Sequence, residues 1–297
     1  KLINKKKAFP LAGSTNIAFD QVEIFQRGKK GIVESNFYSI NEIKALSKKK
    51  KTIITTDINK ITSKRKSILG LKFDNPQIMG ALNITPDSFS DGGLFFNDSK
   101  AYNQAILMIK NGATIIDVGG ESTRPGSKIV KEKDEWNRIK NTIIKLRKNF
   151  PKLPLSLDTR KSYVMKKGIE NNISIINDVS GLNFDNKSFD LINSKRIPFI
   201  LHHMQGVPDT MQKNPKYDDV LLDIYDFFDE KINFCLKKKY KKEFIVIDPG
   251  IGFGKNLDHN LRLMSKISTF HSLGHPILIG TSRKRFIEHI VTKFDTP

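Results

Sequence analysis

The sequence predicts an α/β protein built as a (β/α)₈ barrel, for three reasons. From residue 77 onward, apolar runs of strand length alternate with longer amphipathic runs of helical period. Seven such strand–helix units follow one another, which indicates a parallel sheet covered by helices. Nearly every predicted strand also ends in a polar or charged side chain. We therefore expect a barrel over residues 76–297, preceded by an extension over residues 1–75.

Each predicted strand is a short apolar run, and each predicted helix is a longer run with apolar residues at helical spacing. The strands are expected at residues 77–83, 113–118, 155–158, 174–177, 198–202, 244–248 and 276–280. The helices that follow them are expected near residues 99–111, 131–149, 161–171, 187–194, 218–239, 256–269 and 283–292.

The polar strand ends distinguish a barrel from a doubly wound open sheet. They are Asn83, Asp117, Asp158, Asn177, Asp178, His202, His203, Asp248, Thr281 and Ser282. In a barrel all strand ends converge on one rim, where active sites lie. In an open sheet only the strands beside the topological switch point would need such ends. The pattern favours the barrel, and we expect the eighth unit to be missing by truncation, because the chain ends at Pro297.

The chain is strongly basic. Lysine and arginine number 51 against 31 acidic residues, a net charge of +20. Such a charge can mark a nucleic-acid-binding protein. The lysines are nevertheless scattered over many predicted helices, and no basic patch is interleaved with aromatic residues. We interpret them as solvated helix faces that would also attract an anionic small substrate, and we do not expect a nucleic-acid partner.

Membrane and secreted classes are not expected. No apolar run approaches the roughly 20 residues that cross a bilayer, and the first residues do not resemble a signal peptide. The single cysteine, Cys235, excludes an internal disulfide and fits a reducing cytoplasm. Residues 1–75 contain short mixed segments, such as 21–25 and 52–56, separated by lysine-rich stretches. We expect them to form an extension of modest structure, and no motif in them indicates a role.

The side chains of the rim suit a polar heterocycle and an anion. Asp158, Asn177 and Asp248 offer hydrogen-bonding groups from three strands, and a carboxylate matches the donor row of an amino-pyrimidinone edge. Asn83 could bind Mg²⁺ through its amide oxygen. Arg124 in a glycine-rich loop suits phosphate oxygens. For any single strand-end aspartate, capping of the next helix is the competing interpretation.

The other motifs in the sequence give weaker indications of function. Residues 248–255 form a glycine-rich stretch, but neither a dinucleotide fingerprint nor a P-loop. His202 and His203 are adjacent, so on a strand their side chains would point in opposite directions and would not share a metal. No Gly-x-Ser-x-Gly elbow is present. None of these patterns supports a different chemistry.

Two longer motifs resemble a known family. MGALNITPDSFSDGG at residues 79–93 and DVGGESTRPG at residues 117–126 are similar to the two signatures of the dihydropteroate synthases. Shorter matches follow in the same order, namely LDT at 157–159, INDV at 176–179, HMQG at 203–206, DPGIGFGKN at 248–256 and SRK at 282–284. The resemblance covers residues 77–293 approximately, and the first two motifs are long and specific.

The resemblance implies a pterin-binding TIM barrel that condenses 6-hydroxymethyl-7,8-dihydropterin diphosphate with 4-aminobenzoate. It implies Mg²⁺ beside the diphosphate, a homodimer for the full-length protein, and early cleavage of the bond to diphosphate. The loop at residues 85–93 is expected to close together with the loop at 119–126, which would exclude water from the reactive cation.

Residue roles are carried over position by position. The resemblance implies pterin binding by Asp158, Asn177, Met204, Asp248 and Lys284, of which Lys284 also approaches the aminobenzoate. It implies aminobenzoate and diphosphate contacts from Thr123, Arg124, Pro125, Phe253 and Ser282, and a diphosphate and Mg²⁺ contact from Asn83. The groups expected to act in catalysis are Asn83, Arg124 and Lys284.

One departure and two alternatives accompany this interpretation. The family has an Arg-x-His motif on an eighth strand, which this sequence does not reach before Pro297. A pterin-binding methyltransferase would share the carboxylates but would not need the two signature loops. A basic RNA-binding protein that keeps the barrel would explain the charge of +20, and its binding would be sensitive to salt.

Overall fold

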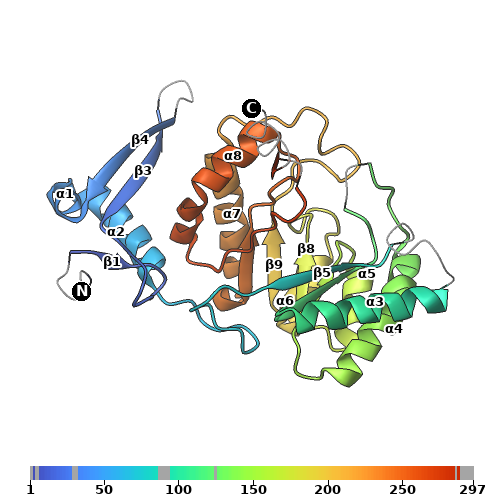
Figure 1. Ribbon diagram of the computed structural model, residues 1–297. Helices are drawn as coiled ribbons and strands as arrows, with labels where there is room; N and C mark the ends of the chain where they lie inside the picture. Colours follow the sequence, from blue (N-terminus) through green and yellow to red (C-terminus); the bar gives the residue numbers. More distant parts are fainter. Residues whose placement is uncertain are drawn as a thin grey trace, which may run out of the picture.

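A computed structural model describes residues 3, 7–28, 33–85, 94–123, 126–284 and 286–287, the side chains of residues 94–97 excepted. Its centre is a parallel sheet in which each strand lies beside its neighbours in the sequence (Figure 1). The strands are β5 (Met79–Asn83), β6 (Ile115–Gly119), β7 (Leu155–Asp158), β8 (Ile175–Asp178), β9 (Phe199–His202) and β10 (Ile245–Asp248). The order β5 to β10 has no reversal, as in a barrel and unlike a doubly wound sheet.

The seventh predicted strand, at residues 276–280, is shorter than expected. Ile277 forms an isolated parallel bridge with Ile247 of β10, and Leu278 donates its backbone N–H to the Ile247 carbonyl at 2.8 Å. The segment therefore continues the sheet in the expected order and direction, but with one bridge in place of a regular strand.

Helices follow the strands as predicted. They are α3 (Leu94–Lys110), α4 (Glu132–Asn149), α5 (Ser162–Glu170), α6 (Ser188–Lys195), α7 (Val220–Lys237) and α8 (Leu257–Ser265). The helix expected at 256–269 is divided between α8 and the 3₁₀ helix η4 (Ile267–Leu273), and most of the helix expected at 283–292 lies outside the described residues. Within the described chain, each helix is too short or too polar to span a bilayer.

The strands are buried on both faces, and each face has a different role. Successive side chains of a strand point to opposite sides. Ile116, Leu157 and Ile176 are fully buried in the core that the strands share with the helices. The alternate residues form a second apolar cluster, which consists of Leu71, Ile115, Ile175 and Ile200 with Met79, Val246 and Leu278 packed against them. This second cluster fills the interior of the barrel.

The polar strand ends continue the interior set. Asp117, Asn177, His202 and Asp248 each follow a residue of the interior cluster by two positions. Because the side-chain period of a strand is two, they lie on the same interior side, nearer the carboxyl ends of the strands. The fold thus places an apolar floor beneath a layer of polar side chains.

The N-terminal extension is more regular than the sequence led us to expect. It contains β1 (Phe9–Pro10), β2 (Ala18–Phe19), β3 (Gln21–Arg27), β4 (Val33–Ser39), α1 (Ile40–Ala45) and α2 (Lys48–Thr62). Strands β3 and β4 pair antiparallel along their whole length. Helix α1 begins with a capping box, because the Ser39 side chain accepts from the backbone of Glu42 and the Glu42 side chain accepts from that of Ser39.

The extension lies against the side of the barrel that carries α7, α8 and η4 (Figure 1). Arg27 of β3 forms ion pairs with Asp223 at 2.8 Å and Asp226 at 2.6 Å, both on α7. Lys266, between α8 and η4, pairs with Glu23 of β3 at 2.7 Å. Helix α2 packs on η4. These contacts fix one face of the extension to the outer helices.

Candidate active site

The predicted site residues of the first four strands lie at one level of the barrel. In the sheet register Asn83 is opposite Gly119, Gly119 is opposite Asp158, and Asp158 is opposite Asn177. Gly119 leaves room for its neighbours: a Cβ atom there would lie 3.2 Å from Oδ2 of Asp158 and 3.3 Å from Oδ1 of Asn83. The side chains of Asn83 and Asp158 therefore approach each other over this glycine, which any larger residue would crowd.

Asp117 joins the site, although the sequence analysis gave it no role beyond a polar strand end. Asn177 donates from Nδ2 to Oδ2 of Asp117 at 2.9 Å. The other oxygen of each side chain, Oδ1, is buried and has no hydrogen-bond partner among the described residues. A buried acceptor without a donor is costly. The pair therefore presents two oxygens to a ligand that carries N–H or O–H groups.

Among the described residues, Asp117 and Asp158 have no counter-ion. Burial, followed by the charges of Asp117 and Glu135, raises the pKa of Asp158 well above its ordinary value. Burial also raises the pKa of Asp117, and the charge of Asp248 adds to this rise. No cation of the described chain forms an ion pair with either group. Burial at the mouth therefore favours protonated carboxyls, and donors from a ligand would favour the ionised forms.

Asp248 also shapes the turn after β10. Its Oδ1 accepts from the backbone N–H of Gly250 at 2.8 Å, so this oxygen closes the turn, whereas the next helix, α8, is capped by Asn256. Gly250 has a φ of +67°, and a Cβ atom there would lie only 1.9 Å from the carbonyl oxygen of His203. The turn therefore requires glycine, and it brings the 249–254 loop against the end of β9.

Lys284 and Phe253 come together beside Asp248. The Lys284 ammonium lies over the Phe253 ring, 4.0 Å from its centroid, and His202 meets the same ring edge-on at 4.6 Å. Burial lowers the pKa of Lys284, while the charge of Asp248 opposes this shift. The contact places one cation and one aromatic face together at the end of the barrel.

The remaining predicted residues are less well connected. Met204 is half-buried in the loop after β9, Thr123 is half-buried after β6, and Ser282 is exposed two residues before Lys284. The structure describes no contact between these three and the carboxyl cluster. Arg124, Pro125 and the loop at residues 86–93 lie outside the described residues.

A buried lysine beside the site was not predicted. Lys255 is 2% exposed. Its Nζ donates to the Phe253 carbonyl at 2.9 Å and lies 3.0 Å from Nδ1 of His203. Burial lowers the pKa of Lys255 to about 7, against an opposing effect of Asp248, and burial together with Lys255 lowers the pKa of His203 well below its ordinary value. The glycine-rich sequence of residues 248–255 does not predict that Lys255 is buried.

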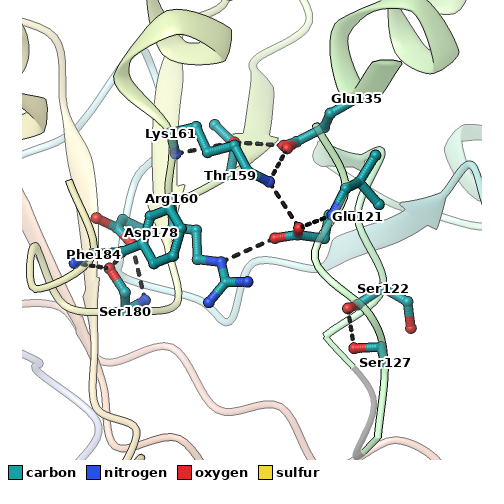
Figure 2. Close-up of polar contacts among 11 residues, drawn as sticks. Glu121, Ser122, Ser127, Glu135, Thr159, Arg160, Lys161, Asp178, Ser180 and Phe184 are labelled. Carbon is teal, nitrogen blue, oxygen red and sulfur yellow. Dashed lines mark hydrogen bonds and ion pairs between the residues drawn. The ribbon is translucent and has the colours of Figure 1, made fainter. Parts of the chain in front are cut away.

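An ionic network lies beneath the loop that follows β6 (Figure 2). Lys161 pairs with Glu121 at 2.7 Å and also with Glu135 of α4. Arg160 donates from Nε to the second Glu121 oxygen at 2.9 Å, and Thr159 donates to Glu135 at 2.5 Å. All five side chains are buried. We call these residues, Glu121, Glu135, Thr159, Arg160 and Lys161, the anchor network.

The anchor network holds the described part of the second signature loop. Glu121 also accepts from the backbone N–H of Val130 at 2.8 Å, so one side chain joins both ends of the loop. Burial opposes the ionised form, but the hydrogen bonds from Lys161 and Val130 outweigh it and lower the pKa of Glu121. Farther along, the backbone N–H of Gly126 donates to the Pro208 carbonyl at 3.2 Å. The base of the loop is thereby fixed, and its far side touches the loop after β9.

Comparison with known proteins identifies the family of this chain. The sequence profile of the family called Pterin binding enzyme matches residues 79–296. The dihydropteroate synthase of Haemophilus influenzae is 41% identical over 218 residues, which cover 73% of this chain and 78% of that protein. Among solved structures, the Yersinia pestis dihydropteroate synthase in a sulfonamide drug complex has a TM-score of 0.70 at 40% identity, covering 76% of this chain and 82% of that one.

A third comparison extends the agreement. The dihydropteroate synthase of Xanthomonas albilineans in complex with 7,8-dihydropteroate has a TM-score of 0.66 at 33% identity, covering 75% of this chain and 79% of the other. The profile match begins at residue 79, close to the start of the predicted barrel. The chain therefore belongs to the pterin-binding enzymes and, among them, to the dihydropteroate synthase family.

Proposed function

We propose that this chain condenses 6-hydroxymethyl-7,8-dihydropterin diphosphate with 4-aminobenzoate to give 7,8-dihydropteroate and diphosphate, a step of folate biosynthesis. The observation that carries the proposal is a group of acceptors for which the described residues supply no partner. Two are buried oxygens of Asp117 and Asn177 without a hydrogen bond, and the third is the Asp158 carboxyl, with which no described cation pairs. The relative from Xanthomonas albilineans holds the product of this reaction.

The pterin ring is proposed to lie inside the mouth of the barrel. Its amino-pyrimidinone edge presents N–H donors in a row, and Asp158, Asn177 and Asp248 supply acceptors there. Hydrogen bonds to a charged group contribute about 1.5–3 kcal/mol each, so the unpaired carboxyls make this edge the main determinant of specificity. Met204, half-buried after β9, is proposed to contact the ring face.

The reaction is a substitution at the methylene carbon of the pterin. The bond from this carbon to the diphosphate oxygen breaks, and the leaving group keeps the electron pair. A bond from the arylamine nitrogen to the carbon forms, and this nitrogen then gives one proton to diphosphate or to solvent. Positive charge develops on the carbon and negative charge on the departing oxygens, so fixed charges at both places lower the barrier.

The residues near Phe253 are proposed to receive the second substrate. The Phe253 ring and the ammonium of Lys284, 4.0 Å apart, offer an aromatic face and a cation to a benzoate-like ring. Ser282, exposed before Lys284, adds a hydroxyl. Thr123, Arg124 and Pro125 are proposed to close over the diphosphate, and the anchor network holds the base of their loop.

Mg²⁺ is proposed to accompany the diphosphate. The described residues contain no cluster of three histidine, cysteine or acidic side chains that could hold a metal alone. Mg²⁺ keeps several waters and commonly binds to one or two protein oxygens together with substrate phosphates. Asn83 is an exposed residue whose Oδ1 lies at the mouth beside Asp158, and it fits that mode. When bound, the ion would neutralise charge on the leaving group.

Three further points stay predictions. The extension at residues 1–75 is treated as a unit separate from the barrel, which the family profile begins to match at residue 79. A homodimer is expected for the full-length protein, and a cytoplasmic location is expected from the use of a single cysteine.

Diphosphate release tests the proposed function. The purified protein is mixed with Mg²⁺ and either substrate alone or both together, and diphosphate is measured with time. The proposal predicts release only when both substrates are present, in equal amount to dihydropteroate. Release without 4-aminobenzoate, or no release with both substrates, would contradict it.

A further inference from the structure

A second cavity lies where the extension meets the barrel. Its volume is about 420 Å³, and its walls come from α2 and the following residues on one side and from residues 242–243 and 274–276 on the other. The barrel residues in this set precede β10 and the Ile277 bridge, so they lie at the amino ends of the strands. The proposed active site lies at the carboxyl ends. We call this second site the junction cavity.

The junction cavity is lined by positive charge. Its cationic side chains are Lys60, Lys64, Arg65, Lys66 and Lys242, against a single carboxylate, Glu243. Three of the five have acidic partners: Lys60 lies 3.4 Å from Asp57, Lys64 lies 3.0 Å from Asp74, and Lys66 lies 3.1 Å from Glu243. Among the described residues, Arg65 and Lys242 have none. The wall therefore keeps a surplus of positive charge.

Arg65 is the buried member of this wall, with 8% of its surface exposed. It donates to the backbone carbonyls of Lys60 at 2.7 Å, Ser63 at 2.8 Å and His271 at 3.1 Å. Its Nε has no partner in the described chain. These bonds hold the guanidinium in place without neutralising it, because carbonyl groups carry no net charge.

His275, on the barrel side of the cavity, also has a buried nitrogen without a hydrogen-bond partner in the described chain. It is 1% exposed. Its Nδ1 lies 3.2 Å from the Ile245 carbonyl oxygen, and its Nε2 is buried with no partner among the described residues. Burial and the charge of Lys242 lower the pKa of His275 to about 4. The ring is therefore neutral at pH 7 and does not add to the charge of the empty cavity.

Lys242 brings the two walls close together. A Cβ atom at Gly274 would lie 3.1 Å from Nζ of Lys242 and 3.5 Å from Cβ of Lys60. The Lys242 ammonium, from the barrel, and the Lys60 side chain, from α2, thus both lie beside Gly274. Partial burial, and then the charges of Lys60 and Arg65, lower the pKa of Lys242, which is the response of a cation that has cations for neighbours.

We propose that the junction cavity binds a phosphorylated small molecule, with its phosphate held by Lys60, Lys242 and Nε of Arg65. A phosphate dianion offsets two positive charges, which a carboxylate cannot do, and accepts hydrogen bonds on several oxygens. The volume of about 420 Å³ exceeds that of a free phosphate. Thr56, Asn59 and Ser63 in the same wall offer polar groups to the rest of such a molecule.

Binding at this place would link the two parts of the chain. Lys60 and Arg65 belong to the extension, whereas Lys242 and His275 belong to the barrel, so one phosphate would contact both. The ligand would stabilise the packing of α2 on η4, because a ligand stabilises the arrangement to which it binds. This inference does not depend on the reaction proposed for the barrel mouth.

Calorimetric titration of the whole chain tests the proposal. The probes are inorganic phosphate and ribose 5-phosphate, with ribose as the uncharged control, all at one ionic strength. We expect the double variant Lys60→Gln/Lys242→Gln to bind ribose 5-phosphate at least tenfold more weakly than the unaltered chain. The variant Lys148→Gln/Lys195→Gln loses the same charge at exposed positions outside the cavity and should differ by less than twofold.

Two further measurements separate the junction cavity from the barrel mouth. Lys284→Gln should leave ribose 5-phosphate binding unchanged, and hydrogen exchange with ribose 5-phosphate present should slow in α2 and at residues 270–276. Tighter binding of ribose 5-phosphate than of phosphate would support an organic ligand, and equal binding would restrict the site to phosphate. Equal weakening in both double variants, no binding of either probe, or binding only of a single-stranded RNA oligonucleotide would overturn the proposal.

Discussion

Two acidic clusters lie at the ends of the same two strands, β6 and β7, and their counter-ions differ. In the anchor network, Glu121 and Glu135 share Lys161, and Arg160 completes the pairing. At the mouth, Asp117 is buried and Asp158 is half-buried, no described cation pairs with them, and burial raises the pKa of both. Paired charges fix a loop, whereas unpaired carboxyls leave hydrogen-bonding capacity for a ligand. Carboxyl side chains therefore have a structural role where cations lie beside them and a proposed binding role where the described chain supplies no cation.

The largest expected effect comes from removing the shared cation of the anchor network. Lys161→Met leaves Glu121 and Glu135 buried with less compensation, which typically costs about 3–5 kcal/mol. Urea denaturation measures the loss in the free energy of unfolding. Lys167→Met, which removes an exposed lysine of α5, is the control and should change stability by less than about 0.5 kcal/mol. A loss in Lys161→Met no larger than this would refute the pairing.

The next effect concerns ligand affinity at the mouth. Asp248→Asn keeps an oxygen that can accept from Gly250 and so preserves the turn, but it removes the charge that faces the pterin. We expect pterin affinity to fall by about ten- to a hundredfold, from the 1.5–3 kcal/mol of one charge-assisted hydrogen bond. Equilibrium binding of a pterin analogue measures this. Unchanged affinity would remove Asp248 from the pterin site.

A smaller effect is expected from the loop anchor. Glu121→Gln keeps the size of the side chain but weakens its bonds to Arg160 and Lys161, so the loop at 119–130 should be held less firmly. We expect kcat/KM for the pterin diphosphate to fall about tenfold, or ~1.4 kcal/mol. Affinity for a pterin analogue without diphosphate should stay within twofold. The control is Glu132→Gln, exposed at the start of α4; an equal effect there would argue against anchoring.

The smallest effect is a dependence of pterin binding on pH. The pKa of Asp158 in the empty site lies well above 3.8, and donors from the pterin favour the ionised carboxylate. Affinity should therefore rise as pH increases toward the raised pKa of the ligand-free site, and become level above it. Titration calorimetry across this range measures the trend. Affinity that falls with rising pH would show that the protonated carboxyl is the binding form.

The barrel could be predicted because its signal is local. Each strand from β5 to β10 is an apolar run of about the right length, and the polar residue at its end belongs to the same run. A period of two then places Asp117, Asn177 and Asp248 inside. Neighbouring strands pair in their order along the sequence. The sequence therefore predicts which polar side chains lie at the mouth of the barrel.

The extension and the anchor network could not be predicted, for two physical reasons. Strand β4 reads VESNFYS and has no buried residue. Helix α2 has isoleucines at helical spacing, at positions 54, 58 and 61, but it buries only Ile58, so its apolar face is a weak signal. Glu121 and Lys161 are separated by 40 positions, and nothing near either residue indicates the other. The burial of Lys255 depends in the same way on His203, which lies 52 positions away.

The stability of Asp158→Asn, with and without a pterin analogue, tests the contrast between the clusters most directly. A buried carboxyl with a raised pKa loses stability as pH rises above about 3.8, because the unfolded chain ionises first. At pH 7 the asparagine variant should therefore be more stable than the unaltered protein, and the analogue should stabilise the variant less than it stabilises the unaltered protein. A variant that is less stable when empty, yet gains as much from the analogue as the unaltered protein does, would contradict the account.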